Sequence, residues 1–278
     1  TTPLTAYLFA DVVRQADLPP GVVNIITGPG EIGMELVTHP DVNKVAFTGS
    51  TATWSHLGAR LRAGFTVVAV DLPGHGQSSA PEDPSRYALP SFADDLQRLL
   101  DVLGLGRVAM LGYSLGGRAA LQFALRHGSQ LSAMVLESTS PGIELSAERA
   151  TRAQADAELA DFIDLEGIEA FVDRWEQLPL WSSQSALRHE ARTALRAQRL
   201  LNVPKGLANS LRGAGAGATA PVTERVKEIE VPTLLIAGAL DEKYASRATA
   251  MAGAMPHAQL AIVPDAGHAV HFERPEEF

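Results

Sequence analysis

The sequence predicts an α/β fold built around a mostly parallel β-sheet. Short apolar runs alternate along the chain with longer amphipathic segments, and this alternation is typical of β-α-β units whose helices cover both faces of a sheet. The 278 residues are 46% hydrophobic and 20% charged. That is enough apolar material for one large core, or for a core with an appended unit.

Short apolar runs predict the strands. Valine, isoleucine and leucine dominate these runs, and turn-forming residues bound them, as expected for buried strands of a parallel sheet. The predicted strands are residues 22–26, 44–47, 66–70, 107–111, 132–136, 233–237 and 259–263.

A helix is predicted to start near Ser91. Ser91 is a good N-cap residue, and Asp94 and Asp95 place acidic side chains in the first turn. Gly104 or Gly106 is expected to end this helix. Its apolar face repeats at helical spacing, with Leu96, Leu99, Leu100 and Leu103.

The pattern changes between Pro141 and about Ala220, where charge-rich helical segments replace the strands. The predicted helices are residues 147–163, 168–177, 185–200 and 205–212. We interpret residues 141–219 as a helical cap inserted into a core formed by residues 51–140 and 220–278. The glycine- and alanine-rich residues 213–218 predict a flexible return to the sheet, either an inert linker or a hinge.

Ser114 is the candidate nucleophile. It lies in the segment Gly112-Tyr113-Ser114-Leu115-Gly116, directly after a predicted strand. A serine on a tight strand-to-helix turn passes close to neighbouring backbone, so the flanking glycines are needed because they lack a Cβ atom. The helix that begins at Leu115 directs free backbone N–H groups toward an oxyanion beside Ser114. The same letters also occur in ordinary turns, so the pattern needs partners elsewhere in the chain.

An acid and a base follow in the order that such a serine requires. Asp241 comes shortly after the predicted strand at residues 233–237, and His268 comes after the last predicted strand. A neutral serine needs an imidazole to accept its proton, and a carboxylate to fix the imidazole tautomer and stabilise its cation. We therefore expect Ser114, His268 and Asp241 to form a catalytic triad. Glu137, after the strand at 132–136, is the alternative acid.

The overall charge and the missing cysteines exclude several classes of function. A net charge of −9 and a pI near 5.4 argue against a general nucleic-acid or anionic-membrane surface. The chain contains no cysteine, which excludes disulfides, thiolate zinc sites and a cysteine nucleophile. No apolar run of membrane-spanning length and no leader-like start are found, so we expect a cytoplasmic protein without metal or membrane partners.

Five segments carry a family resemblance. From about Phe47 to Phe278 the chain resembles the α/β-hydrolase superfamily and, within it, the family of 2-succinyl-6-hydroxy-2,4-cyclohexadiene-1-carboxylate synthases of menaquinone biosynthesis. The matching segments are Phe47-Thr-Gly-Ser50, Val70-Asp-Leu-Pro-Gly-His-Gly-Gln-Ser78, Gly112-Tyr-Ser-Leu-Gly-Gly-Arg118, Gly238-Ala-Leu-Asp-Glu-Lys-Tyr244 and Gly267-His-Ala-Val-His-Phe-Glu-Arg-Pro275. The second segment is shared by many hydrolases, and His75 within it is expected to be a structural loop residue.

The resemblance implies an elimination rather than a hydrolysis. Such synthases expel pyruvate from a cyclohexene that carries an enolpyruvyl ether and several carboxylates. Ser114, deprotonated by His268, would remove a carbon-bound proton. Backbone N–H groups of Phe47 and Leu115 would hold the developing oxyanion.

The resemblance also implies a set of residues that bind the small polyanionic carboxylate substrate. Guanidinium groups suit carboxylates in an otherwise acidic protein, and Arg118, Arg152 and Arg199 match the family's basic positions. Tyr113 and Trp175 match aromatic positions of its pocket. Solvated surface arginines, and simple core packing for Trp175, are the alternatives.

The first fifty residues resemble a different family. Thr2 to Gly28, then Gly33 to Asp41 and Lys44 to Thr51, are similar to the cofactor domain of aldehyde dehydrogenases. We therefore infer a chimera, in which an α-β-α-β fragment at residues 1–50 replaces the opening strands of the hydrolase. Val45 and Ala46 stand where the synthase has histidine and glycine.

The fragment is not expected to bind a dinucleotide. Gly28-Pro-Gly30-Glu-Ile-Gly33 follows a predicted strand and opens a helix, as the glycine fingerprint requires. The acidic residue expected about twenty positions later is missing from residues 51–54, which are Thr, Ala, Thr and Trp. We expect no cofactor. Three functions stay open: a lyase, an ester or lactone hydrolase with the same triad, and a catalytically inert engineered chimera.

Overall fold

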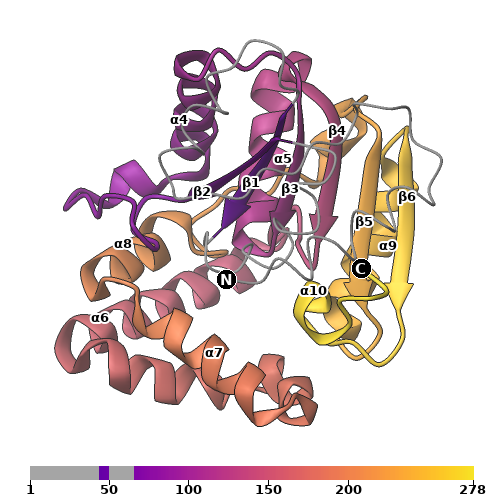
Figure 1. The fold of residues 1–278 in the computed structure, drawn as a ribbon. Helices are drawn as coiled ribbons and strands as arrows, with labels where there is room; N and C mark the ends of the chain where they lie inside the picture. Colours follow the sequence, from indigo (N-terminus) through magenta and orange to yellow (C-terminus); the bar gives the residue numbers. More distant parts are fainter. Residues whose placement is uncertain (1–43, 50–65) are drawn as a thin grey trace.

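A six-stranded parallel sheet lies at the centre of the described part of the chain (Figure 1). The computed structural model describes residues 44–49 and 66–278. The strand order is β2-β1-β3-β4-β5-β6, and every neighbouring pair is parallel. The strands are β1 (Lys44–Gly49), β2 (Thr66–Asp71), β3 (Val108–Tyr113), β4 (Leu131–Glu137), β5 (Thr233–Gly238) and β6 (Ala258–Val263).

The prediction of an α/β fold with a mostly parallel sheet is confirmed. Each of these strands lies within two residues of its predicted bounds. The predicted strand at residues 22–26, like the rest of residues 1–43, lies outside the described residues. The aldehyde-dehydrogenase-like fragment is therefore described only at β1, which pairs with both β2 and β3.

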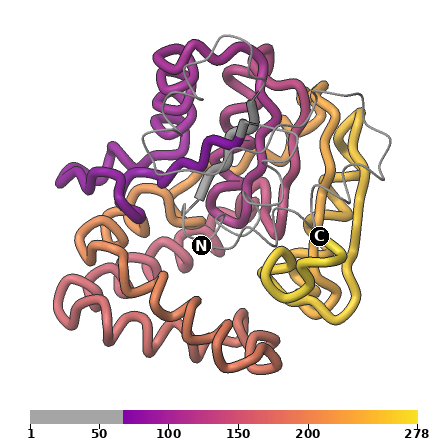
Figure 2. Tube along the Cα trace, viewed as in Figure 1, coloured from indigo at the N-terminus to yellow at the C-terminus, as the bar shows by residue number. Residues whose placement is uncertain are grey.

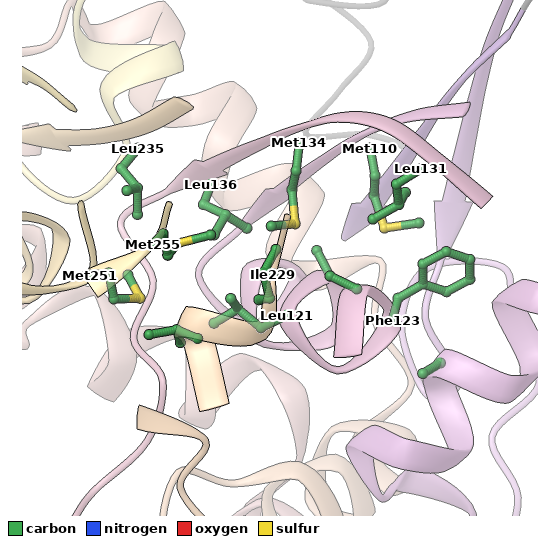
Figure 3. Packing of buried hydrophobic residues seen from close by; sticks show 14 of the residues in the cluster. Met110, Leu121, Phe123, Leu131, Met134, Leu136, Ile229, Leu235, Met251 and Met255 are labelled. Atoms are coloured by element: carbon green, nitrogen blue, oxygen red, sulfur yellow. The ribbon is translucent and has the colours of Figure 1, made fainter. Parts of the chain in front are cut away.

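One face of the sheet carries the larger apolar core. The helices α4 (Leu89–Val102), α5 (Leu115–His127) and α9 (Glu242–Ala254) supply its side chains together with β3, β4 and β5. Figure 3 shows Met110 and Met134 of the sheet with Leu121 and Phe123 of α5. Alternate strand residues face the other side, where Ile236 and Val263 pack with Val270 of the short helix α10 (Val270–Glu273).

The start of α4 differs from its prediction. The helix begins at Leu89, with Pro90 in its first turn, and Ser91 is not its N-cap. Proline is favoured in the first turn because the N–H it lacks has no helical partner there, and this signal outweighs the capping preference of Ser91. The end is as expected, since Gly104 adopts a positive φ of 62° just after the helix.

Three helices between β4 and β5 form a layer beside the edge of the sheet at which the strands end (Figures 1 and 2). They are α6 (Ser146–Glu176), α7 (His189–Leu200) and α8 (Pro204–Ala214), with a 3-10 segment at Pro179–Ala186. Gly167, with φ 80° and ψ −173°, interrupts α6 between the two helices predicted there. Ile163 and Val172 of α6 and Ala208 of α8 share a small buried cluster.

The glycine-rich return from these helices is packed, not loose. A Cβ atom on Gly217 would collide with the backbone nitrogen of Ala153 in α6, and one on Gly215 would lie 2.6 Å from Asp156 Oδ2. The Thr219 hydroxyl donates to the Gly215 carbonyl at 3.0 Å. The prediction of a flexible linker at residues 213–218 is therefore wrong, because the small residues serve close packing. The domain boundaries at residues 50, 140 and 219 stay predictions.

Candidate active site

Ser114 lies on a strained turn between β3 and α5, which we call the nucleophile elbow. Its φ of 51° and ψ of −108° fall where residues other than glycine rarely lie. A Cβ atom on Gly112 would lie 2.5 Å from the Gly116 carbonyl oxygen, and one on Gly117 would lie 2.5 Å from Thr139 Cβ. The Thr139 hydroxyl donates to the Ser114 carbonyl at 2.7 Å. The close backbone approach thus accounts for glycine at position 112, as the sequence predicted.

The structure brings Ser114, His268 and Asp241 together. His268 Nε2 lies 3.0 Å from Ser114 Oγ, and His268 Nδ1 lies 2.6 Å from Asp241 Oδ2. The side chains of His268 and Asp241 are 1% and 9% exposed. With Nδ1–H donating to the carboxylate, the neutral imidazole presents an Nε2 acceptor to the serine hydroxyl. This is the hydrogen-bond chain that serine activation requires.

Asp241 is fixed by the element that follows it. It is the N-cap residue of α9, and its Oδ1 accepts from the Tyr244 amide at 3.4 Å. A carboxylate at a helix N-terminus is stabilised by the orphan amides and the helix dipole. Asp241 can therefore turn its other oxygen to His268.

Glu137, the alternative acid, does not contact His268. Its Oε2 lies 2.8 Å from His271 Nδ1, and its Oε1 accepts from the His271 amide at 3.1 Å. Glu137 is fully buried and the His271 side chain is 4% exposed. The two candidate acids therefore serve two different histidines, and Asp241 is the one placed to act with Ser114.

The ring of Tyr113 lies close to both histidines. Its ring centroid lies 5.4 Å from that of His268 and 4.9 Å from that of His271. Burial, and then the charge of Glu137, raise the pKa of the Tyr113 hydroxyl well above 10. The phenol therefore stays protonated at neutral pH and can donate a hydrogen bond.

The two predicted oxyanion donors lie on adjacent elements. Leu115 is the first residue of α5, so its N–H has no acceptor inside the helix. Phe47 lies within β1, opposite Leu111 of β3, because β1 continues two residues beyond its predicted end to Gly49. The donor role of both amides stays a prediction.

Arg118 lies one turn into α5 from Ser114, and its amide donates to the Ser114 carbonyl at 3.2 Å. Its Nη1 is enclosed and has no hydrogen-bond partner among the described residues. Burial lowers the pKa of Arg118 to about 10, which leaves it a cation at neutral pH. An enclosed cation without a paired carboxylate is costly, so this guanidinium is suited to an anionic ligand.

Arg152 is held by a buried carboxylate. Its Nε donates to Asp156 Oδ1 at 2.7 Å, and the two side chains are 42% and 5% exposed. The positive charge of Arg152 lowers the pKa of Arg118, and the negative charge of Asp156 raises it. Arg152 therefore lies in the same electrostatic neighbourhood as Arg118, and its substrate-binding role stays a prediction. Apart from its spacing of four residues from Arg152, no local pattern indicates a role for Asp156.

Arg199 lies in α7, within the layer of helices beside the sheet, and contacts a separate group of side chains there. It donates to Glu176 Oε1 at 2.8 Å and to Gln184 Oε1 at 2.9 Å. Its guanidinium carbon lies 5.2 Å from the ring centroid of Trp181, a cation–π geometry. Trp175 lies beside Trp181, with ring centroids 5.8 Å apart, rather than next to His268.

Two aromatic residues next to His268 were missed by sequence reasoning. The ring of Tyr244 lies 4.6 Å from the His268 ring, and that of Trp181 lies 5.4 Å from it. Tyr244 follows Asp241 by three residues, in the first turn of α9. This spacing from the predicted acid could have indicated that Tyr244 lies near His268. Trp181 comes from a 3-10 segment with no periodicity, and nothing local indicates its partner.

A cavity of about 490 Å³ opens between α7 and the 3-10 segment. Its lining includes Trp181, Arg192, Arg196 and Arg199, with the carboxylate of Glu176 among them.

Within the described ranges, no group of three or more histidine and carboxylate side chains is arranged to hold a metal ion. The same ranges contain no helix that is long and apolar enough to span a membrane.

Comparisons with known proteins agree with this fold. The model of the α/β hydrolase fold matches residues 46–275. A Bacillus subtilis (strain 168) protein, provisionally named 2-succinyl-6-hydroxy-2,4-cyclohexadiene-1-carboxylate synthase, is 43% identical over 84% of this chain and 84% of its own length. The solved structure of MenH from S. aureus has a TM-score of 0.82 at 34% identity, over 87% of this chain and 92% of that one.

The fold and the nucleophile elbow define this chain as an α/β hydrolase. The family model assigns most of the chain to the same class. Within that class, the chain belongs to the family of 2-succinyl-6-hydroxy-2,4-cyclohexadiene-1-carboxylate synthases. A thermophilic esterase from Thermogutta terrifontis, solved with malate bound, is more distant, with a TM-score of 0.76 at 25% identity over 86% of this chain and 87% of that one.

The start of the chain matches a second family. The model of the aldehyde dehydrogenase family matches residues 1–83, which supports the inference of a chimera. The two matches overlap over residues 46–83, around the predicted junction at residue 50. The shared stretch includes most of β1 and all of β2.

Proposed function

We propose that this chain is a lyase that eliminates pyruvate from the cyclohexene substrate of its family, which carries an enolpyruvyl ether and several carboxylates. Membership in the synthase family supports this activity. The observation that carries the proposal is the enclosed Arg118 Nη1, four residues after Ser114 and without a partner among the described residues. A substrate carboxylate supplies the partner that this cation lacks.

The proposed reaction uses the triad to move a proton. His268 accepts the Ser114 proton, and the serine oxygen then removes a proton from a ring carbon. The electron pair of that C–H bond forms a C=C bond as the C–O bond to the enolpyruvyl group breaks. The leaving group departs as enolpyruvate, takes up the proton held by His268 and becomes pyruvate, which returns the triad to its starting state. The Leu115 and Phe47 amides stabilise the negative charge that develops on oxygen. Asp241 stabilises the His268 cation meanwhile.

The remaining cations bind and orient the substrate. Arg152, held by Asp156, and Arg199, held by Glu176 and Gln184, have fixed guanidinium groups, and fixing them lowers the entropy lost when a carboxylate binds. Tyr113 and Trp175 complete the proposed pocket. We place this activity in the cytoplasm, because a chain without cysteine suits a reducing compartment.

The test is pyruvate release from the enolpyruvyl cyclohexene substrate, followed with a coupled lactate dehydrogenase assay. We expect turnover by the full chain, loss of turnover in Ser114→Ala, and parent activity in Ser246→Ala, which removes an exposed hydroxyl from α9. Pyruvate release that survives Ser114→Ala rules out the proposed role of this serine.

A carboxylic-ester or lactone hydrolase is the second candidate, because the same hydrogen-bond chain serves acyl transfer and an esterase is among the similar solved structures. Rapid turnover of p-nitrophenyl esters without pyruvate release identifies that activity. A folded chain that is silent in both assays is a catalytically inert chimera.

A further inference from the structure

The loop that carries His268 is held by a carboxylate that the proposed reaction does not use. Glu273 Oε2 accepts from the Gly267 amide at 2.7 Å, and its Oε1 accepts from the Ala269 amide at 3.3 Å. These two amides belong to the residues immediately before and after His268. Glu273 is only 8% exposed, so both hydrogen bonds are largely shielded from water and are stronger for it.

The glycine in this loop lets the carboxylate approach. A Cβ atom on Gly267 would lie 3.0 Å from Glu273 Oε2 and would collide with the Ser183 hydroxyl. The backbone at Gly267 is thus in close contact with both Glu273 and the 3-10 segment. The position of His268 therefore depends on side chains that contact its neighbours, not on the imidazole alone.

The helix that carries Glu273 is itself tied to the nucleophile. Glu137 binds the His271 amide and Nδ1 with its side chain, and its carbonyl accepts from the Ser114 amide at 2.9 Å. One fully buried residue therefore contacts both the backbone of Ser114 and the helix α10. A shift of α10 moves Glu273, and with it the loop of His268, relative to Ser114.

We propose that Glu273 is a positioning residue for His268: its carboxylate fixes the loop from both sides, and the Glu137–His271 pair fixes α10 against the nucleophile. The inference rests on the proposed role of His268 as the base. A displacement of about 1 Å between reacting groups can cost about 100-fold in rate, so such a brace affects catalysis without touching the substrate.

The test compares Glu273→Gln with Glu277→Gln in the full chain. Glutamine keeps the size of Glu273 but retains one acceptor oxygen, and its NH2 group faces an amide donor. Glu277 is an exposed carboxylate in the same segment, so its variant removes the same charge without removing these contacts. Circular dichroism and thermal melting establish that both variants are folded.

Three readouts are followed. The first is the set of imidazole nitrogen shifts in long-range ¹H–¹⁵N spectra of the histidine-labelled chain, with the His268 signals assigned by their loss in His268→Gln. The second is the rate at which a fluorophosphonate labels Ser114. The third is the pair kcat and KM for pyruvate release.

We expect Glu273→Gln to shift the His268 signals, to slow labelling, and to lower kcat by about 10- to 100-fold with KM within about twofold. Glu277→Gln is expected to match the parent in all three. A purely structural role lowers the melting temperature but leaves the His268 signals of the folded protein in place. His268 signals and labelling rates identical in Glu273→Gln and the parent overturn the inference.

A second variant and a second set of readouts allow the inference to be tested if Glu273→Gln does not fold or the parent is inactive. If Glu273→Gln does not fold, Glu273→Asp keeps both oxygens and the charge on a shorter side chain, and the His268 signals are expected to shift from their positions in the parent; unchanged signals overturn the inference. A parent chain that releases no pyruvate contradicts the proposed function alone, because the spectra and the labelling still decide on Glu273.

Discussion

Asp241 and His268 are 27 positions apart in the chain, yet Asp241 Oδ2 lies 2.6 Å from His268 Nδ1, with both side chains buried. The hydrogen bond fixes which nitrogen of His268 faces Ser114. Because this tautomer is the one that can accept the serine proton, the activity of the whole site depends on this contact.

Asp241→Asn is expected to lower kcat by about 10⁴-fold, because an amide can hold the opposite imidazole tautomer and does not stabilise its cation. Pyruvate release and fluorophosphonate labelling of Ser114 measure the effect. Glu277→Gln serves as the comparison, since Glu277 is an exposed carboxylate outside the hydrogen-bond chain of Ser114, His268 and Asp241. If Asp241→Asn labels Ser114 as fast as the parent does, this carboxylate is not the triad acid.

Arg118→Met is expected to lower kcat/KM for the carboxylated substrate by about 10- to 100-fold, the value of one or two charge-assisted hydrogen bonds. Stability is expected to be unchanged or higher, because a buried cation without a paired charge is replaced by an apolar side chain. Arg98→Met, at an arginine paired with Asp95 on the surface of α4, is the control. Equal kcat/KM values for the two variants contradict a substrate-binding role for Arg118.

Gly112→Ala is expected to destabilise the chain by about 1–3 kcal/mol, because the new Cβ atom meets the Gly116 carbonyl at 2.5 Å. Gly253→Ala is the matched control in α9. No heavy atom lies within 4 Å of a Cβ atom there, and alanine in a helix stabilises by about 0.5–1 kcal/mol. Urea unfolding measures both changes, and a Gly112→Ala chain as stable as the parent excludes the close approach at the elbow.

His75 is expected to make stability depend on pH. Burial lowers the pKa of His75 below 6.5, so the unfolded chain binds the proton more tightly than the folded one. The contribution to stability is complete above pH 6.5 and is lost as the pH falls from there toward the lowered pKa. Urea unfolding of the parent and of His75→Gln between pH 5 and 7 checks this, and identical slopes against pH refute it. The hydrogen bond from the His75 ring to the Pro73 carbonyl, at 3.2 Å, supports a structural role.

Local patterns in the sequence predicted the strands and the candidate triad. Apolar runs identify buried strands because a strand that is covered on both faces buries the side chains of consecutive residues. The elbow glycines are readable because the turn at Ser114 forbids a Cβ atom at position 112. The N-terminus of α4 was predicted at Ser91 instead of Leu89, since two local start signals compete there and the proline at position 90 outweighs the capping preference of Ser91.

Local patterns could not decide which of the two candidate acids contacts His268. Asp241 and Glu137 each come at or shortly after the end of a strand, and spacing along the chain does not say which one meets His268. In the fold, Glu137 pairs with His271, while the N-cap geometry of α9 directs Asp241 to His268. Trp181 and Asp156 likewise gain their roles only from what packs beside them.

The sequence by itself determined the class of fold, the family, and which residues carry the reactive groups, because these follow from hydrophobic period, turn chemistry and motif spacing. Only the tertiary structure decided how those groups pair: Asp241 with His268, Glu137 with His271, and Glu273 with the amides on either side of His268. The physical reason is that hydrogen bonds act over about 3 Å, and the loops that carry these groups reach such distances only when the sheet and its helices pack together.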